Sequence, residues 1–213
     1  VNFAEAQVGA YPSRPIKTIV PYTPGGGNDY LGRLLAERMQ PAIGQPVVVE
    51  NKPGASTVIG AEFVARQPAN GYTLLVITNT IVNNVGFFPK LPYDPIRDFE
   101  PITLVATTPF VLAVSANTPV NSMKEFIALA RARPGTLTYA TAGNGSPQHL
   151  AAELLKSMAG IDMLYVPYKG SVPALTDVIS GRVTYTFETV AATMPHVRSG
   201  RLKTYGISIG RNS

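Results

Sequence analysis

The stretch IKTIVPYTPGGGNDYLGRLLAERM, residues 16–39, decides the fold class of this chain. Its apolar start, residues 16–21, predicts a β-strand, and the proline- and glycine-rich residues 22–27 predict a sharp turn. A helix is expected to follow, with Asn28 or Asp29 as its N-cap and leucines at helical spacing on one face. This order of strand, glycine-rich turn and helix is typical of α/β proteins.

Two further strands and a second helix extend this stretch into a βαβαβ unit. Residues 47–50 and 72–78 predict the strands, and Ser56 or Thr57 is expected to cap the helix between them. Such a unit is the signature of a parallel sheet covered by helices. Residues 79–100 are rich in proline and are expected to be irregular.

The second half of the chain alternates in the same way. Ser122 and Glu125 form a capping box that predicts the start of a helix. Ser146 as N-cap and Pro147 at the first helical position predict another helix, which Gly160 ends. A third helix is expected at 173–179 and a short one before 202, with strands at 102–106, 110–115, 137–141, 163–167, 183–187 and 202–209.

We expect these elements to form two lobes, each a mainly parallel sheet flanked by helices. A boundary near residue 101 would separate a first lobe, 11–101, from a second lobe, 102–209. The long apolar runs 102–115 and 202–209 are candidates for the segments that cross between the lobes.

The composition excludes several classes of function. The chain has 213 residues with 45% hydrophobic and only 15% charged residues, so it is expected to pack a core. It has no cysteine, which excludes thiol catalysis and cysteine-ligated metals, and its two histidines show no metal-ligand spacing. The net charge of +5 is spread out without a basic run, so nucleic-acid binding is disfavoured and an anionic small ligand is compatible.

Two glycine-rich loops offer places for an anion. In the loop 24–29 and again in the loop 143–146, glycines precede a predicted helix start. Flexible glycine backbone can turn its N–H groups toward a ligand, and the helix adds the positive end of its dipole. Each loop alone could also be an ordinary strand–helix turn. On opposite lobes, the two loops would point two helix N-termini at one anion.

Two enzymatic alternatives fit these residues less well. Glu50 follows the first glycines at a spacing that imitates a nicotinamide-binding fingerprint, but Tyr30 occupies the position of its third glycine. An NAD-dependent oxidoreductase with a degenerate glycine-rich loop is therefore the alternative function. Ser146 and His149 share one helix turn, which does not make a nucleophile–base pair, and the sequence has no G-x-S-x-G elbow. We predict that the chain is not an enzyme.

Several separate blocks of the sequence resemble one known family, the Bug family of extracytoplasmic solute receptors of tripartite tricarboxylate transporters. The blocks agree with the family pattern in order and spacing from about residue 11 to the end. They are YPSRPI (11–16), the loop 21–29, GQPVVVENKPG (44–54), NGYTLL (70–75), LPYDP (91–95), AGNGS (142–146) with His149-Leu150, VPYKG (166–170) and Pro195-His196.

The resemblance implies a two-lobed periplasmic binding protein that closes like a type II clamshell on a small carboxylate. It implies no metal and no cofactor, transient contact with membrane subunits of a transporter, and a periplasmic location after removal of a signal peptide. The ligand-binding residues that it implies are Tyr22, Thr23, Pro24, Gly25, Gly26, Gly27, Asn28, Asp29, Thr78, Asn79, Thr80, Ala142, Gly143, Asn144, Gly145, Ser146, His149, Tyr168, Lys169, Gly170, Glu188 and Thr189.

The sequence shows one notable feature at each end and one departure from the family pattern. Val8-Gly9-Ala10 has the small residues of a signal-peptidase site, although a plain terminus is an equal interpretation. Family members continue beyond the position of Arg211 and return to the first lobe, so we expect the first lobe to lack its C-terminal part and to expose apolar surface. Ser56-Thr57 stands where the family commonly has glycines, which is expected to affect only the shape of the local loop.

Overall fold

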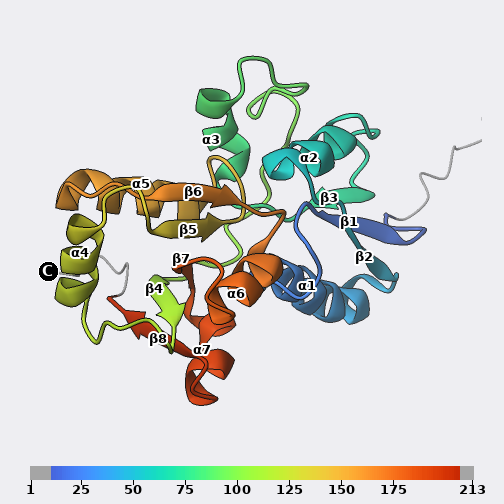
Figure 1. Ribbon diagram of the computed structural model, residues 1–213. Coiled ribbons are helices and arrows are strands. Elements are labelled where there is room, and N and C mark those ends of the chain that lie inside the picture. The colour runs from blue at the N-terminus through green and yellow to red at the C-terminus, as the bar shows by residue number, and fades with distance from the viewer. Residues whose placement is uncertain (1–10, 207–213) are drawn as a thin grey trace, which may run out of the picture.

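The first lobe is built on a three-stranded parallel sheet (Figure 1). In the computed structural model, which describes residues 11–206, the central strand is β1 (Ile16–Val20). It pairs in parallel with β2 (Val47–Asn51) and with β3 (Thr73–Leu75).

Helices cover both faces of this sheet, as burial of a parallel sheet requires. On one face lies α1 (Gly27–Ile43), whose Ala36 packs against β-strand residues such as Ile16 and Val47. On the other face, a 3₁₀ turn η1 (Ala55–Thr57) leads into α2 (Val58–Ala65), and α3 (Thr80–Phe87) packs beside it.

The second lobe has a mixed five-stranded sheet in the order β6-β5-β7-β4-β8. The strands β5 (Thr138–Thr141), β6 (Leu164–Pro167) and β7 (Tyr185–Thr189) run parallel to one another. Antiparallel to them, β4 (Phe110–Ser115) pairs with β7 and also with β8 (Leu202–Tyr205), which is the edge strand on that side.

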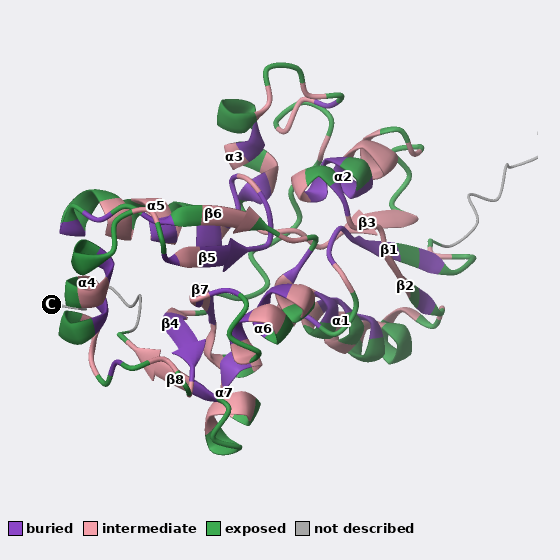
Figure 2. Ribbon diagram, in the orientation of Figure 1, coloured by how far each residue is buried: buried purple, intermediate pink, exposed green. Residues whose placement is uncertain are grey.

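Two pairs of helices sandwich this sheet. Phe126 of α4 (Met123–Ala132) and Ala152 of α5 (Pro147–Ala159) pack against one face of the sheet. The opposite face carries α6 (Ser171–Ile179) and α7 (Val190–Arg198). Figure 2 shows buried residues along the inner strand β4 and exposed residues on the outer sides of the helices. The expected α/β class, with parallel pairing and flanking helices in each lobe, is confirmed.

Three sequence predictions about elements were wrong. The segment 79–100 contains α3, although it was expected to be irregular. The run 102–106 forms no strand, and Ile102 and Leu104 are 75% and 78% exposed. A strand needs a neighbour for its backbone hydrogen bonds, and no strand of residues 11–206 lies beside this run. Finally, α1 begins after Gly26 and not after Asn28 or Asp29.

Other expectations concern residues or boundaries that stay as predictions. The signal-peptidase pattern Val8-Gly9-Ala10 and the last residues of the expected strand 202–209 lie outside the described residues. The lobe boundary near residue 101 falls between the last strand of one sheet and the first of the other.

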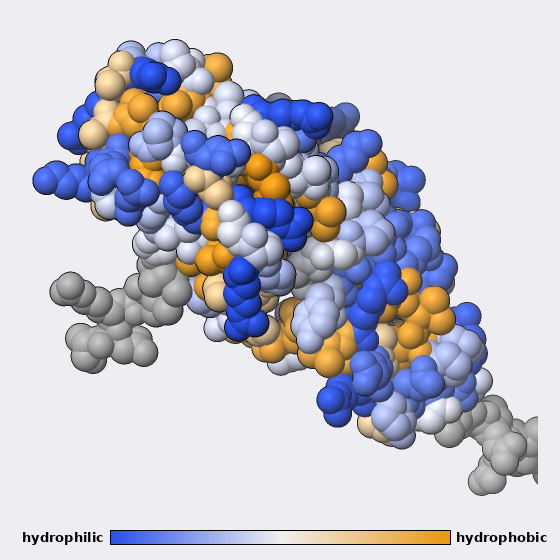
Figure 3. All heavy atoms as spheres, turned by 60° about the horizontal axis from the view of Figure 1, so that its bottom comes forward, coloured by the Kyte–Doolittle hydropathy of each residue, from blue (hydrophilic) through white to orange (hydrophobic). Residues whose placement is uncertain are grey.

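The described part of the chain offers no helix with the length and apolarity to cross a membrane. On the face shown in Figure 3, apolar patches are separated by hydrophilic side chains.

Candidate functional site

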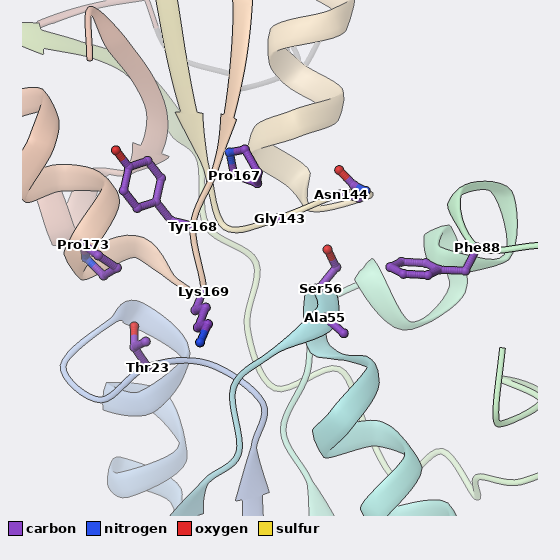
Figure 4. A pocket seen from close by; sticks show the side chains of 10 residues that line it. All are labelled: Thr23, Ala55, Ser56, Phe88, Gly143, Asn144, Pro167, Tyr168, Lys169 and Pro173. Carbon is purple, nitrogen blue, oxygen red and sulfur yellow. The ribbon is translucent and has the colours of Figure 1, made fainter. Parts of the chain in front are cut away.

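A cavity of about 610 Å³ lies between the two lobes (Figure 4). The first lobe contributes the β1–α1 loop, the turn before α2 and the end of α3, and the second contributes the loops after β5 and β6 and the start of α6. The ten lining residues are Thr23, Ala55, Ser56, Phe88, Gly143, Asn144, Pro167, Tyr168, Lys169 and Pro173.

Half of these lining residues were expected from the sequence: Thr23, Gly143, Asn144, Tyr168 and Lys169. They come from three loops that are far apart in the chain, and the fold brings them to one cavity. The residues that the sequence analysis missed are Ala55, Ser56, Phe88, Pro167 and Pro173.

Lys169 is the one charged residue among the ten that line the cavity. Its side chain is exposed, extends from the β6–α6 loop toward the first lobe, and has no ion-pair partner among residues 11–206. The neighbouring Tyr168 donates its hydroxyl hydrogen to Asp177 Oδ2, with 2.6 Å between the oxygens. Burial and this carboxylate raise the pKa of Tyr168 to about 12. Lys169 is therefore the group in the cavity that can attract an anionic ligand.

The glycine-rich loop 24–29 is held from within by Asp29. Asp29 Oδ2 accepts the Gly25 N–H at 2.8 Å and lies 3.0 Å from Arg33 Nε, while Asp29 Oδ1 accepts from Asn51 at 2.8 Å. Burial raises the pKa of Asp29, but these three donors outweigh it and lower the pKa overall. Because a carboxylate of the chain already takes the Gly25 N–H, this amide is not free for a ligand. Asp29 thus fastens the loop, and Gly25 and Gly26 line a separate hollow of about 180 Å³ beside α6 and α7.

Tyr22 and the residues 78–80 form a hydroxyl chain beneath the cleft. Thr78 Oγ1 lies 2.7 Å from the Tyr22 hydroxyl and 2.8 Å from Thr80 Oγ1. Tyr22 is buried, and burial raises its pKa although the two threonines act against the shift. Asn79 occupies the N-cap position of α3 without a side-chain cap. These residues support the first-lobe wall and do not line the cavity.

The turn before α2 has an unusual backbone. Three successive non-glycine residues have positive φ, namely Ala55 at 44°, Ser56 at 52° and Thr57 at 75°. This left-handed region is costly for residues with a Cβ, and such strain gathers at functional sites. Asn84 Nδ2 donates to the Ser56 carbonyl at 2.9 Å and so holds the turn. The departure of Ser56-Thr57 from the glycines of the resembling family was expected to affect only the shape of the loop, but it is the sequence signal that could have indicated this wall of the cavity.

The second-lobe loop 143–146 has the helix start that the sequence predicts. Ser146 is buried, and its Oγ accepts the His149 N–H at 3.3 Å as the N-cap of α5. Asn144 Oδ1 accepts the hydroxyl of Tyr165 at 2.6 Å, which fixes this residue at the edge of the cavity. Ala142 is also buried, directly after β5.

Glu188 is buried behind the cavity at the ends of three helices. Its Oε1 accepts the Thr189 N–H at 2.8 Å, and the side chains of Gln148 and Ser171 also hydrogen-bond to it. These residues belong to the first turns of α5 and α6 and to the N-cap of α7. Burial raises the pKa of Glu188 more than these donors lower it. Glu188 therefore organises helix starts around the cleft and is not among the residues that line the cavity.

Three of the expected glycines, Gly26, Gly27 and Gly170, lie at the contact between the lobes. A Cβ at Gly26 would lie 3.8 Å from Ser171, and one at Gly27 would lie 3.7 Å from Thr189 Oγ1. Gly170 is buried against Thr23. Pro24 and Asn28 belong to the same loop and helix start of the first lobe but do not line the cavity. Within residues 11–206, no group of His, Asp and Glu has a metal-binding arrangement.

A family model described as "Tripartite tricarboxylate transporter family receptor" matches residues 31–212. The chain belongs to this receptor family. The match covers most of the chain and both halves of the fold, and it agrees with the resemblance that the sequence blocks indicated. In this chain, the glycine-rich fingerprint of the oxidoreductase alternative corresponds to a strand–helix turn that Asp29 fastens.

Known relatives of this receptor family are similar over nearly the whole chain. Protein BugT of Bordetella pertussis is 39% identical over 206 residues, which are 96% of this chain and 63% of BugT. A structure of an R. palustris protein with adipate is 38% identical with a TM-score of 0.91, covering 94% of this chain and 67% of that one. MatC from Rhodopseudomonas palustris with bound malate is 32% identical with a TM-score of 0.88, covering 94% and 68%. The chain therefore spans about three-fifths to two-thirds of the length of these relatives.

Proposed function

We propose that this chain is the main part of a periplasmic receptor that binds a small dicarboxylate between its lobes and presents it to the membrane subunits of a tripartite transporter. The observation that carries the proposal is the interlobe cavity, in which Lys169 is the only charge among the lining residues. Two related structures of the family hold adipate and malate, which are both dicarboxylates.

The two halves of the cavity suit two different parts of such a ligand. The side-chain NH₂ group of Asn144 offers a hydrogen-bond donor for one carboxylate, close to the start of α5, whereas the Gly143 N–H is already donated to Thr141 Oγ1 at 3.1 Å. Lys169 offers an ammonium group for the other carboxylate. Phe88, Pro167 and Pro173 supply apolar surface for the carbon chain between them.

The other residues that the resemblance implies act around this contact set in the proposal. Asp29 and Tyr22 hold the first-lobe loops, and Ser146, His149 and Glu188 hold the second-lobe helix starts. A micromolar affinity requires about −8 kcal/mol. Three or four charge-assisted hydrogen bonds of about 1.5–3 kcal/mol each are of the right size before the costs of association.

Substitution of Lys169 tests the proposal. Lys169→Gln removes the charge, and we expect it to weaken adipate binding about tenfold, within the range for a charged hydrogen bond. Binding of hexanoate, which has the same carbon number but one carboxylate, is expected to change less than twofold. Lys90→Gln is the matched control, because Lys90 is an exposed lysine outside the cavity and has no ion pair within residues 11–206. Equal loss of adipate and hexanoate binding would contradict the role of Lys169.

A further inference from the structure

The helix α3 of the first lobe contacts both walls of the cavity from two consecutive asparagines. Asn84 Nδ2 donates to the Ser56 carbonyl at 2.9 Å, on the wall of its own lobe. Asn83 Nδ2 donates to the Gly145 carbonyl at 2.8 Å, on the wall of the other lobe. The helix therefore connects the strained turn before α2 to the loop before α5.

The contact between α3 and the second lobe is closely packed. A Cβ at Gly145 would lie 3.0 Å from Phe87, 3.2 Å from Asn84 Oδ1 and 3.3 Å from the Asn83 Cβ. Gly145 also has a φ of +67°, which a glycine adopts without strain. The Phe87 ring lies 5.2 Å from the His149 ring, so an aromatic contact across the lobes accompanies the hydrogen bond.

His149 binds the backbone of the same glycine, Gly145. Its Nδ1 accepts the Gly145 N–H at 3.2 Å, so this nitrogen must carry no proton. The imidazole is buried and stacks on Tyr165 at 4.5 Å between ring centroids. The backbone of Gly145 is thus held at its N–H by His149 and at its C=O by Asn83.

We propose that Asn83, Phe87, Gly145 and His149 form an interlobe latch that sets how firmly the cleft closes, and that protonation of His149 Nδ1 releases it. A protonated Nδ1 is a donor and can no longer accept the Gly145 N–H. The loop that Asn83 contacts then loses its support, and the lobes separate more readily. The latch itself does not depend on the proposed function; only the measurement of adipate binding described below rests on it.

The surroundings of His149 determine the direction of the pH effect. The titratable groups near it are Glu153 and Lys156 on α5, Tyr139 on β5 and Tyr165 on β6, while α3 presents the uncharged Phe87. Burial lowers the pKa of His149 below its usual range, Glu153 opposes this shift and Lys156 adds to it.

Glu153 stays ionised and the neighbouring tyrosines Tyr139 and Tyr165 stay neutral near neutral pH. Burial raises the pKa of Glu153, but hydrogen bonds from Tyr139 and Lys156 lower it overall, and burial raises the pKa of both tyrosines.

Opening of the latch exposes His149 to water and returns its pKa toward the ordinary value. The closed form therefore has the lower pKa, and protons favour the open form. The contribution of His149 to closure is fully present above the open-state pKa and is lost as pH falls through the closed-state pKa. We expect the loss between about pH 7 and pH 5.

Fluorescence energy transfer between the lobes measures closure directly. The chain has no cysteine, so dyes can be attached to Glu37→Cys on α1 and Lys124→Cys on α4, both exposed positions. At pH 7.5, Asn83→Ala is expected to reduce the closure equilibrium about fivefold, as for one lost hydrogen bond. Val85→Ala is the matched control, because Val85 lies on the same helix and is 58% exposed. An unchanged closure equilibrium in Asn83→Ala, or an equal change in both variants, would overturn the latch.

The second arm varies the histidines. His149→Gln keeps an acceptor that does not titrate, and we expect the transfer signal to become independent of pH between 7.5 and 5. His149→Phe keeps the ring but has no acceptor, so closure is expected to be low at both pH values. His196→Gln, which changes the other histidine, is expected to retain the pH dependence. Retention of the pH dependence in His149→Gln, or its loss in His196→Gln, would overturn the role of His149.

Adipate titrations of the same labelled variants add the ligand readout. We expect Asn83→Ala to bind adipate about fivefold more weakly, in step with its closure equilibrium. Absence of adipate binding to the unsubstituted chain would count against the proposed function. The dye signal and its pH dependence would still test the latch in that case.

Discussion

Gly170 of the second lobe lies directly against Thr23 of the first. A β-carbon at position 170 would overlap Thr23 Oγ1 and would lie 3.1 Å from the Thr23 nitrogen. The backbone of Gly170 is extended, with a φ of 165°, so an alanine there would meet no backbone strain. A larger residue at position 170 would therefore prevent the two lobes from approaching this closely.

Gly170→Ala is therefore expected to hinder closure without unfolding either lobe. We expect adipate affinity to fall at least tenfold, while the melting temperature without ligand changes by less than about 2 °C, because opening of the lobes relieves the overlap with Thr23. Calorimetric titration and thermal melting measure the two quantities. Gly86→Ala is the control, because a Cβ at position 86 would meet nothing within 4 Å. Unchanged adipate affinity in Gly170→Ala would show that the ligand binds without this closure.

Ser56→Gly tests the strain in the turn before α2. Ser56 has a φ of 52°, and glycine adopts this conformation without the cost of a Cβ. We expect the free energy of unfolding to rise by about 1 kcal/mol, measured by denaturant melting. Ser180→Gly is the matched control at a φ of −74°, where it is expected to destabilise the protein. A loss of stability in Ser56→Gly as large as that in the control would mean that the turn stores no strain.

Ser146→Ala separates capping from ligand binding. Because Ser146 Oγ caps α5 through the His149 N–H, the substitution is expected to lower the free energy of unfolding by about 1 kcal/mol. Adipate affinity is expected to fall less than threefold. The exposed Ser157 on the same helix gives the control Ser157→Ala, which should leave both values nearly unchanged. A tenfold loss of adipate affinity would instead make the Ser146 hydroxyl a ligand contact.

Glu188→Gln is expected to change how stability depends on pH. Burial raises the pKa of Glu188 in the folded protein. The contribution of protonated Glu188 to the free energy of unfolding is therefore fully present below the unfolded-state pKa and is lost as pH rises through the folded-state pKa. The glutamine can retain the hydrogen bond from Thr189 without a buried charge. We therefore expect the variant to gain about 1–3 kcal/mol relative to the unsubstituted protein between pH 4 and pH 8. Denaturant melts across this range measure the gain, with the exposed Glu37→Gln as control. A difference that does not vary with pH would refute this titration.

The elements that the sequence predicted well are those that local chemistry determines. Ser122 caps α4 through the Glu125 N–H, and Ser146, Pro147 and Gly160 delimit α5 as expected. These caps need only neighbouring residues, so their signal is visible in the sequence. The lining residues Gly143 and Lys169 were likewise accessible, because they belong to blocks that resemble the family.

The features that were missed depend on contacts distant in sequence. The helix α3 has weak helix formers, and Asn83 and Asn84 fix it through carbonyls at Gly145 and Ser56. Positive φ at Ala55 is likewise invisible in an alanine. The apparent strand at 102–106 has a suitable residue pattern but no pairing strand in the described part of the chain.

Asp29 shows the same limit at the glycine-rich loop. A carboxylate at this position suits an N-cap, yet it lies within the first turn of α1, after the N-cap Gly26, and accepts the Gly25 N–H and an Asn51 donor from β2. The local sequence allows Asp29 to be an N-cap or to bind the preceding loop, and the contact with Asn51, distant in sequence, accompanies the second role. The loop therefore resembles a nucleotide-binding turn in sequence, but the N–H of its first glycine, Gly25, is already bound by Asp29.

Calorimetric titration of the unsubstituted chain with adipate and, separately, with hexanoate tests the central claim most directly. The two ligands have the same number of carbons and differ in the second carboxylate, which the cavity is proposed to place at Lys169. We predict one adipate per chain with a Kd in the micromolar range, and hexanoate binding at least tenfold weaker. Equal affinities for the two ligands, or binding of NAD in the absence of any carboxylate binding, would contradict the account.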